Sequence, residues 1–546
     1  MRAYLSPATV VQPLVHRWYA VPFVAAPHTG ALNLVKRHLP ALRRYLESPE
    51  QHARALADPN MFGAPFIDSG PAGPQGVADL LERTLAEGEA RIRMAEDIDT
   101  MRATLAKNGD GRALAPLYQD LPPALRGVTE LVYDTANNAG LRFFESLLYR
   151  TPATEPHAQT VSLMERHDRA QPFIYSSPIL PAPGRTDLEV PFASELLDEL
   201  FAARLEPVDV EELAEKFGLD EEARVGFRRL FTEQEPRRYV PNGTGEVRMQ
   251  YFGHASVLLD LGGFTVMTDP TVGYDGDGFE GHFTIADLPE TIDVVVLSHG
   301  HSDHFSLETL LQLRRRIGTI VVPQSSGGSL ADIGLRSMLE HFGFRNVVEL
   351  ADMQSVQAGP ATITALPFLG EHGELDIRAK MVPMVRLGGR GFLFATDTSP
   401  IDPALYDMVA EEIGSVDALF IGLECVGAPL TWLYGPLLDT PISREHSLER
   451  GLKGSFAEPA DQLAQRLGAQ QIFVYALGIE PWLKHLTGCW FDPEAEQLRQ
   501  EVILRDLAGQ RGVRSELLYL TAERSWPAAP QDRPAAPQDR PAAPQD

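Results

Sequence analysis

The spacing of apolar residues divides the chain into a helical first part and a strand-rich second part. Over residues 30–150, apolar residues recur mostly at intervals of three and four, which predicts helices. Residues 122–150 continue this pattern behind Pro122 and Pro123, a suitable helix start. Residues 151–190, richer in Pro, Ser and Thr, predict loops or short strands, and "DVEELAEKFGLDEEARVGFRRLF" predicts a helical pair.

The spacing of apolar residues changes from a helical to a strand-like pattern at about residue 241. "GEVRMQYFGHASVLLDLGGFTVMTDP" alternates apolar and polar residues around Gly262-Gly263, which predicts a β-hairpin. Further short apolar segments, among them "TIDVVVLS", "GTIVVP" and "QQIFVYALG", predict strands with helices between some of them. This mixture favours a layered α/β architecture. The chain ends in repeats of PAAPQDR, whose proline content and lack of large apolar residues predict a disordered, solvated tail.

Composition narrows the choice of partners and of compartment. The 546 residues include 75 Asp and Glu against 48 Lys and Arg, a net charge of -27 that disfavours nucleic acid as a partner. No apolar run approaches the roughly 20 residues that span a bilayer, so no membrane partner is expected. Two cysteines are too few for a disulfide framework. We therefore expect a cytoplasmic protein.

A cluster of metal-binding residue types follows one predicted strand. In "VVVLSHGHSDHF", His299 and His301 leave an extended segment, so both side chains point to one side and can bind one ion. Asp303 and His304 lie where the chain turns into the next helix and can reach a second ion. Imidazole and carboxylate ligands together suit zinc, iron or manganese.

This run resembles the signature of the metallo-β-lactamase superfamily, and "YFGHASVLLD…TDP" is similar to the opening strands of that fold. The resemblance covers roughly residues 241–525 and implies an αββα sandwich with a dinuclear metal site at one edge. It also implies that Asp269 orients a ligand histidine, although Asp269-Pro270 alone would pass as a turn. We interpret His254 as a strand-end histidine rather than as a ligand.

Two further ligands are expected downstream. Asp397, in "FLFATDTSP", follows an apolar strand and matches the carboxylate that bridges two metals in the superfamily. The other ligand should come from "LPFLGEHGELDI", where Glu371, His372 and Glu374 compete. Histidine is usual here in hydrolases of the superfamily, which would favour His372.

The spacing and flanking residues resemble more closely the CmlA-type diiron β-hydroxylases of nonribosomal peptide biosynthesis. In that family the position is glutamate, which implies Glu371 as the ligand. A late histidine usual in hydrolases is replaced by Ala476 and Leu477 in "QQIFVYALGIEPW". The last ligand of the second ion is therefore expected to be His446, Glu424 or water.

The resemblance implies a non-haem diiron monooxygenase that hydroxylates the β-carbon of an aminoacyl group on a peptidyl carrier protein, in antibiotic biosynthesis. It implies two Fe ions, O2 as cosubstrate and an external electron donor protein, because no flavin or nucleotide motif is evident. Glu371 and Asp397 are the expected catalytic residues, since their negative charge stabilises oxidised iron. One alternative is a dinuclear zinc hydrolase (two Zn ions) of an ester, thioester or phosphodiester. Another is a non-catalytic binding module with a structural metal.

The predicted domains are a helix-rich mixed N-terminal domain at 1–240, the metal domain at 241–525 and the tail at 526–546. The N-terminal domain is the expected surface for docking or for forming a homodimer. The chain contains two basic clusters, Lys36, Arg37, Arg43 and Arg44, and Arg314–Arg316. Each is predicted to be a solvated helix face. The alternative hypothesis is that they form a landing patch, a surface that binds an acidic carrier protein.

Overall fold

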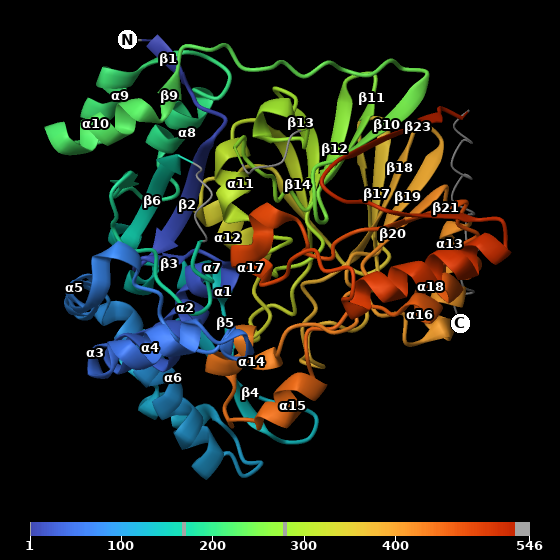
Figure 1. Ribbon diagram of the computed structural model, residues 1–546. Coiled ribbons are helices and arrows are strands. Elements are labelled where there is room, and N and C mark those ends of the chain that lie inside the picture. Colours follow the sequence, from blue (N-terminus) through green and yellow to red (C-terminus); the bar gives the residue numbers. More distant parts are fainter. Residues whose placement is uncertain (1, 166–170, 277–280, 530–546) are drawn as a thin grey trace, which may run out of the picture.

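A computed structural model describes residues 2–165, 171–276 and 281–529 of the chain (Figure 1). The second half is built on two seven-stranded sheets. The first sheet has the strand order β15-β14-β13-β12-β11-β10-β23, and its members are β10 (Glu246–Tyr251), β11 (Val257–Leu261), β12 (Phe264–Thr268), β13 (Ile292–Val296), β14 (Ile317–Pro323), β15 (Val347–Leu350) and β23 (Ala522–Pro527).

The second sheet has the order β16-β17-β18-β19-β20-β21-β22. Its strands are β16 (Ser355–Ala358), β17 (Ala361–Leu366), β18 (Val382–Leu387), β19 (Arg390–Phe394), β20 (Ala418–Ile421), β21 (Gln471–Val474) and β22 (Arg514–Leu517). In each sheet, hairpin-connected antiparallel strands pass into parallel strands, β12 to β15 and β19 to β22. Because parallel strands carry their carboxyl ends at the same edge, the loops that follow them gather on one side of the sandwich.

Helices cover the outer face of each sheet. Helices α13 (Pro403–Ile413), α16 (Ala457–Arg466) and α18 (Glu496–Gln510) pack on the second sheet, where they share one apolar core with its strands. A separate core fills the space between the sheets and contains Phe392, Phe420 and Phe473. Helices α11 (Leu307–Leu313) and α12 (Leu335–His341) cover the first sheet (Figure 1). The predicted αββα sandwich is thereby confirmed.

The N-terminal part packs against the α11–α12 side of the sandwich through one continuous core. It holds an antiparallel sheet of order β3-β2-β6-β7, from β2 (Thr9–Val15), β3 (Trp18–Tyr19), β6 (Gln159–Glu165) and β7 (Arg185–Leu188), and a small sheet of order β8-β1-β9, from β1 (Arg2–Leu5), β8 (Val208–Asp209) and β9 (Phe231–Thr232). Its helices are α1 (Pro22–Ala25), α2 (Pro27–Asn33), α3 (Leu39–Glu47), α4 (Pro49–Leu56), α5 (Gly73–Glu87), α6 (Glu89–Asn108), α7 (Glu145–Leu148), α8 (Glu195–Ala202), α9 (Val210–Lys216) and α10 (Glu221–Arg229). The last two form the expected helical pair, and the domain has the mixed, helix-rich character predicted.

One predicted helix is wrong. Residues 122–150 contain a hairpin of β4 (Thr129–Tyr133) and β5 (Ala139–Phe143), followed only by the short α7. The turn between the strands overrides the apolar spacing. The Asp134 carboxylate accepts hydrogen bonds from the backbone N–H groups of Ala136 and Asn138, and Asn137 takes a left-handed φ of 61°.

The sandwich also extends slightly past its predicted end. Strand β23 continues through Trp526 and Pro527 along β10, so the first residues assigned to the tail belong to the sheet. Residues 530–546, the remainder of the predicted tail, lie outside those that the structure describes. Of the helices in the described part of the chain, none combines the length and the apolar content that a bilayer crossing needs.

Candidate metal centre

The predicted metal ligands gather where loops leave the carboxyl ends of neighbouring strands. Asp269 follows β12, the run from His299 to His304 follows β13, and Asp397 follows β19. Glu371 and Glu424 follow β17 and β20. Both sheets therefore contribute to one cluster at the edge of the sandwich, as the sequence predicted for the H-x-H-x-D-H run.

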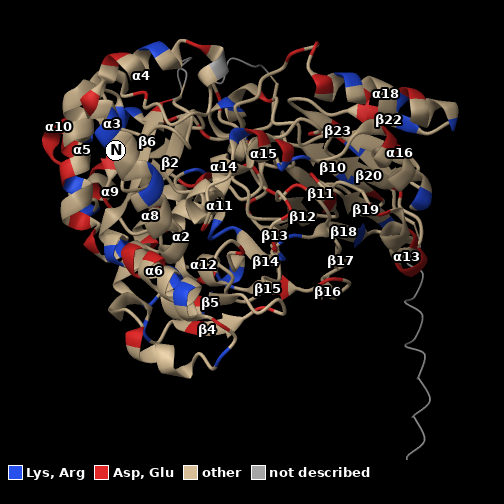
Figure 2. Cartoon of the chain, turned by 90° about the horizontal axis from the view of Figure 1, so that it is seen from below, with Lys and Arg blue, Asp and Glu red and all other residues tan. Residues whose placement is uncertain are grey.

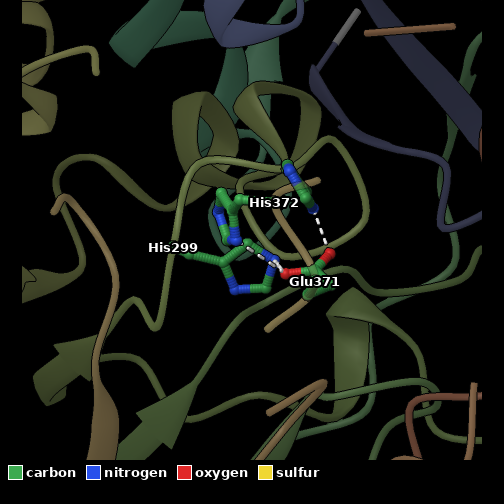
Figure 3. A group of neighbouring side chains, drawn as sticks. His299, Glu371 and His372 are labelled. Atoms are coloured by element: carbon green, nitrogen blue, oxygen red, sulfur yellow. Dashed lines mark ion pairs between the residues drawn. The ribbon is translucent and has the colours of Figure 1, made fainter. Parts of the chain in front are cut away.

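Imidazole nitrogens and carboxylate oxygens face each other in this cluster. Nε2 of His299 lies 3.3 Å from Oε2 of Glu371 and 3.9 Å from Oδ2 of Asp397. Nε2 of His304 lies 2.8 Å from the same Asp397 oxygen, and Nδ1 of His301 contacts Glu371. Figure 3 shows the rings of His299 and His372 turned toward Glu371 from the same side in this view. Asp397 thus lies between His299 and His304.

Several of these atoms are buried without a hydrogen-bond partner among the described residues. They are Nε2 of His299, Nδ1 of His372, Oε2 of Glu371 and Oδ1 of Asp397. Buried polar atoms are rarely left unpaired in folded proteins, because the lost hydration costs free energy. Four such atoms within one cluster of possible ligands fit bound cations, whose charge would satisfy their lone pairs.

Asp269 fixes the orientation of two of the histidines. Its Oδ2 accepts a hydrogen bond from Nδ1 of His304 at 2.9 Å, which leaves Nε2 of His304 free to face Asp397. The same oxygen accepts the hydroxyl of Ser298 at 2.6 Å, and the Ser298 oxygen in turn accepts Nδ1–H of His299 at 2.9 Å. One buried carboxylate therefore sets the tautomer of both rings, so that each presents its Nε2 lone pair to the cluster.

His301 is oriented by a different residue, Tyr434. Its Nε2 lies 2.9 Å from the buried hydroxyl of Tyr434, and its Nδ1 faces Glu371. The Tyr434 ring is itself held edge-on against Phe23 of α1, 5.3 Å away. Sequence reasoning missed Tyr434 because its link to His301 is purely tertiary. Ser298 was also missed, although its place next to His299 is a signal that could have found it.

Burial and neighbouring groups shift the pKa values of His299 and Glu371 in the metal-free cluster. Burial lowers the pKa of His299, which favours the neutral ring that a ligand needs. Burial opposes ionisation of Glu371, but His301, His299 and His372 hold the pKa of its carboxyl well below the usual range. The carboxylate at position 371 is therefore ionised, as a metal ligand must be.

A second group of possible ligands contains His254, Asp303 and His304. Nε2 of His254 lies 3.3 Å from Oδ2 of Asp303 and 3.2 Å from Nε2 of His304. However, Nδ1 of His254 accepts the backbone N–H of Gly478 at 3.1 Å, so the proton of the neutral ring is on Nε2. In this tautomer His254 donates to Asp303 rather than binding a cation. The interpretation of His254 as a simple strand-end histidine missed this contact.

Of the alternatives for the last ligand, the structure brings Glu424 to the cluster and not His446. Burial, together with Asp397, Asp303 and Glu371, raises the pKa of the Glu424 carboxyl well above its usual value. A carboxyl surrounded by three other acids fits a site that also holds cations. His446, the other predicted residue, is exposed on α15 (Arg444–Glu449), and it does not line the pocket that Glu424 lines.

Glu374 and His372, the two alternatives to Glu371 as the predicted ligand, differ in burial. Glu374 is exposed and pairs with Arg450 at 3.7 Å, so it is not part of the cluster. His372 is buried, stacks on His301 with ring centroids 4.4 Å apart, and lies 3.3 Å from Glu371. It is close enough to share a cation with Glu371.

A pocket opens onto this cluster. Its floor contains Asp303, Glu371 and Glu424, and its walls are formed largely by apolar and aromatic side chains, namely Tyr175, Trp432, Leu433, Leu452 and Leu486. Tyr175 comes from the N-terminal domain and donates its hydroxyl hydrogen to Ser302 at 2.8 Å. Both domains therefore shape the access to the candidate metal centre.

Comparisons with known proteins match both parts of the chain. Residues 4–236 match the family described as diiron non-heme beta-hydroxylase N-terminal domain, and residues 265–429 match the beta-lactamase superfamily domain. The chain is 36% identical over 533 residues to 4-amino-L-phenylalanyl-[CmlP-peptidyl-carrier-protein] 3-hydroxylase of Streptomyces venezuelae, covering 95% of this chain and 99% of the relative. The crystal structure of CmlA, a diiron beta-hydroxylase from Streptomyces venezuelae, superposes with a TM-score of 0.89 at 34% identity, covering 96% of this chain and 99% of that one.

Proposed function

Because the chain belongs to the CmlA-type family of diiron β-hydroxylases, we propose that it hydroxylates the β-carbon of an aminoacyl group carried by a peptidyl carrier protein in natural-product biosynthesis. The family implies two iron ions. Dioxygen as cosubstrate, an electron donor protein and a cytoplasmic location are parts of the same proposal.

The donor set supports a dinuclear site. In our assignment His299, His301 and Glu371 hold one ion, and Asp303, His304 and Glu424 hold the other. Asp397 lies within reach of both, since it contacts His304 and faces His299. His372 is assigned as a neighbour of Glu371.

This set is rich in negative charge. Four carboxylates, from Asp303, Glu371, Asp397 and Glu424, would offset the four positive charges of two ferrous ions. Carboxylates also stabilise more highly charged iron better than neutral imidazole does. When bound, the iron pair would supply the activation of dioxygen that hydroxylation of a C–H bond requires.

The protein residues have three tasks in this scheme. Asp269, Ser298 and Tyr434 keep the ligand histidines in the tautomers that expose a lone pair. The apolar and aromatic pocket walls would limit the access of water to the cluster. The tether to a carrier protein would raise the local concentration of the aminoacyl group at the pocket.

The observation that carries the proposal is the buried Glu371 in contact with His299 and His301, beside Asp397, in a chain similar over nearly its whole length to a β-hydroxylase. The test is to incubate iron-loaded protein with an aminoacyl carrier protein, dioxygen and a reductant, and to follow the mass of the tethered group. We expect a gain of one oxygen atom, which Glu371→Ala abolishes. Release of the free, unhydroxylated amino acid from the carrier protein would instead support the hydrolase alternative.

A further inference from the structure

The rim of the metal-site pocket combines features of both domains. A chain of aromatic rings leads outward from Tyr175 beside the cluster. The ring centroids of Tyr175 and Phe173 are 5.5 Å apart. The Phe173 centroid lies 4.9 Å from that of Trp432 and 4.8 Å from that of Phe62. Phe62 is 41% exposed, so this apolar wall reaches the surface of the molecule.

Other apolar side chains are exposed around the same opening. Phe62 lies so close to Gly488 that a Cβ there would stand 2.4 Å from its ring, and Trp490, two residues further, is 55% exposed. Val426 is 52% exposed two residues before Ala428, which lines the pocket. Exposed apolar groups gathered around a functional opening are typical of a surface that contacts another molecule.

Two lysines flank the opening. Lys453 follows the lining residue Leu452, and Lys484 begins α17 (Lys484–Thr487), which carries the lining residues Leu486 and Thr487. Neither lysine has a carboxylate within ion-pair distance among the described residues; the ammonium group of Lys484 lies over the Trp490 ring, 5.2 Å from its centroid. Figure 2 shows basic and acidic residues interspersed along the chain. Lys453 donates only to a backbone carbonyl, that of Glu449 at 3.3 Å. In a chain of net charge -27, two such cations beside the opening favour contact with an acidic partner.

The basic clusters singled out in the sequence do not provide a comparable surface. Arg314 is buried, binds Asp198 at 2.8 Å and donates to backbone carbonyls, and Arg316 is buried against the carbonyls of Leu288 and Pro289. The prediction that Arg314–Arg316 form a solvated face or a landing patch is therefore wrong for these two arginines. Only Arg315 is exposed, and it too pairs with Asp198.

The basic cluster at residues 36–44 likewise contains two residues that bind other groups and two that are exposed. Lys36 pairs with Asp99 at 2.8 Å, and Arg37 donates to the carbonyl of Thr431 at 2.8 Å, next to Trp432. Only Arg43 and Arg44 are exposed, and they lie on α3 and do not line the pocket.

We propose that the pocket rim, defined by Phe62, Val426, Lys453, Lys484 and Trp490, is the docking surface for the acidic carrier protein, with its phosphopantetheine arm lying along the aromatic wall. This inference rests on the proposed function. The lysines complement the arm's phosphate and the acidic residues of the carrier, and the apolar side chains contact its body. The arm then enters between Tyr175 and Trp432, and the aminoacyl group reaches the metal cluster.

The test compares charge reversals with and without the carrier. The double variant Lys453→Glu/Lys484→Glu is assayed with aminoacyl carrier protein and with the matching aminoacyl-pantetheine thioester, which has neither phosphate nor protein. Lys107→Glu is the control, because Lys107 is an exposed lysine at the end of α6 that does not line the pocket. Iron content and sedimentation are measured for each protein.

We expect the ratio of kcat/KM for the carrier substrate to kcat/KM for the thioester to fall about tenfold or more in the double variant. The Kd for the carrier should rise in parallel and lose part of its dependence on salt, while the variant retains its iron and Lys107→Glu keeps the wild-type ratio. A ratio and Kd equal to those of Lys107→Glu would overturn the docking surface, as would a change of oligomeric state with unaltered carrier binding. If the wild-type protein failed to hydroxylate any carrier-bound group, the proposed function itself would fail.

Discussion

Replacing Asp269 by asparagine should weaken metal binding without disturbing the fold. The Asp269 carboxylate accepts three hydrogen bonds, from the backbone N–H of Ser298 at 2.7 Å, from the Ser298 hydroxyl at 2.6 Å and from Nδ1 of His304 at 2.9 Å. Asparagine has the same shape but only one oxygen, so its amide group must face at least one of these donors. The backbone adds no strain, because asparagine tolerates the φ of 35° at this position.

The magnitude follows from the hydrogen bond that is lost. If the amide faces His304, the imidazole must move its proton to Nε2, the atom that faces Asp397, and it can no longer bind a cation there. A hydrogen bond to a charged group contributes roughly 1.5–3 kcal/mol, which corresponds to about 10- to 100-fold in metal affinity. Loss of a partner that orients a ligand typically has an effect of this size.

The assay is a competitive chelator titration with ferrous iron, performed on Asp269→Asn, on wild-type protein and on Asp260→Asn. Asp260 is a suitable control because it is also buried and accepts several hydrogen bonds, from Tyr239, Asn242 and Arg248, none of them a residue of the metal cluster. Its variant should lose stability while keeping its affinity for iron. If Asp269→Asn bound iron within twofold of wild type, the proposed control of the histidine tautomers would be refuted.

Three further predictions concern single side chains. Glu371→Ala should lose iron, whereas His372→Ala should retain two ions per chain by elemental analysis; the reverse result would identify His372 as the ligand. Tyr434→Phe removes the partner 2.9 Å from Nε2 of His301 and should weaken iron binding about tenfold in the chelator titration, and an unchanged affinity would remove Tyr434 from the account. Burial raises the pKa of Glu145 to about 8, so its favourable contribution to stability is full below about 4.5 and is lost as pH rises through about 8. Glu145→Gln should therefore melt close to wild type at pH 4.5 and increasingly above it as the pH rises to about 8, with a constant difference at higher pH. Parallel melting curves between pH 4.5 and pH 8 would contradict the raised pKa.

The part of the site that could be predicted from sequence is the part encoded by local geometry. His299, His301 and His304 follow a strand at spacings that place their side chains together whatever the rest of the chain does. Asp397 could be found because it lies three residues after the buried strand β19 and matches the bridging carboxylate that the resemblance implies. The mixture of predicted strands and helices likewise indicated a layered α/β architecture, because each strand has its own apolar segment, whereas the sandwich itself was implied by the resemblance to the superfamily.

What the sequence could not decide depends on tertiary packing. Glu424 and His446 both follow Asp397 at plausible distances along the chain, and only the path of the chain after β20 brings Glu424 to the cluster and leaves His446 in solvent. The β4–β5 hairpin was missed because its apolar spacing also suits a helix, and the turn at Asp134 decides the outcome. The contact of Tyr434 with His301 joins residues 133 positions apart, which no local pattern records.

The most direct test of the central claim is the elemental metal content of protein made in iron-replete medium, measured together with its Mössbauer spectrum. A dinuclear site built from Glu371, Asp397 and their histidine neighbours predicts two irons per chain and the spectrum of a coupled pair. One iron per chain, two uncoupled irons, or a pair of zinc ions that iron does not replace would contradict it.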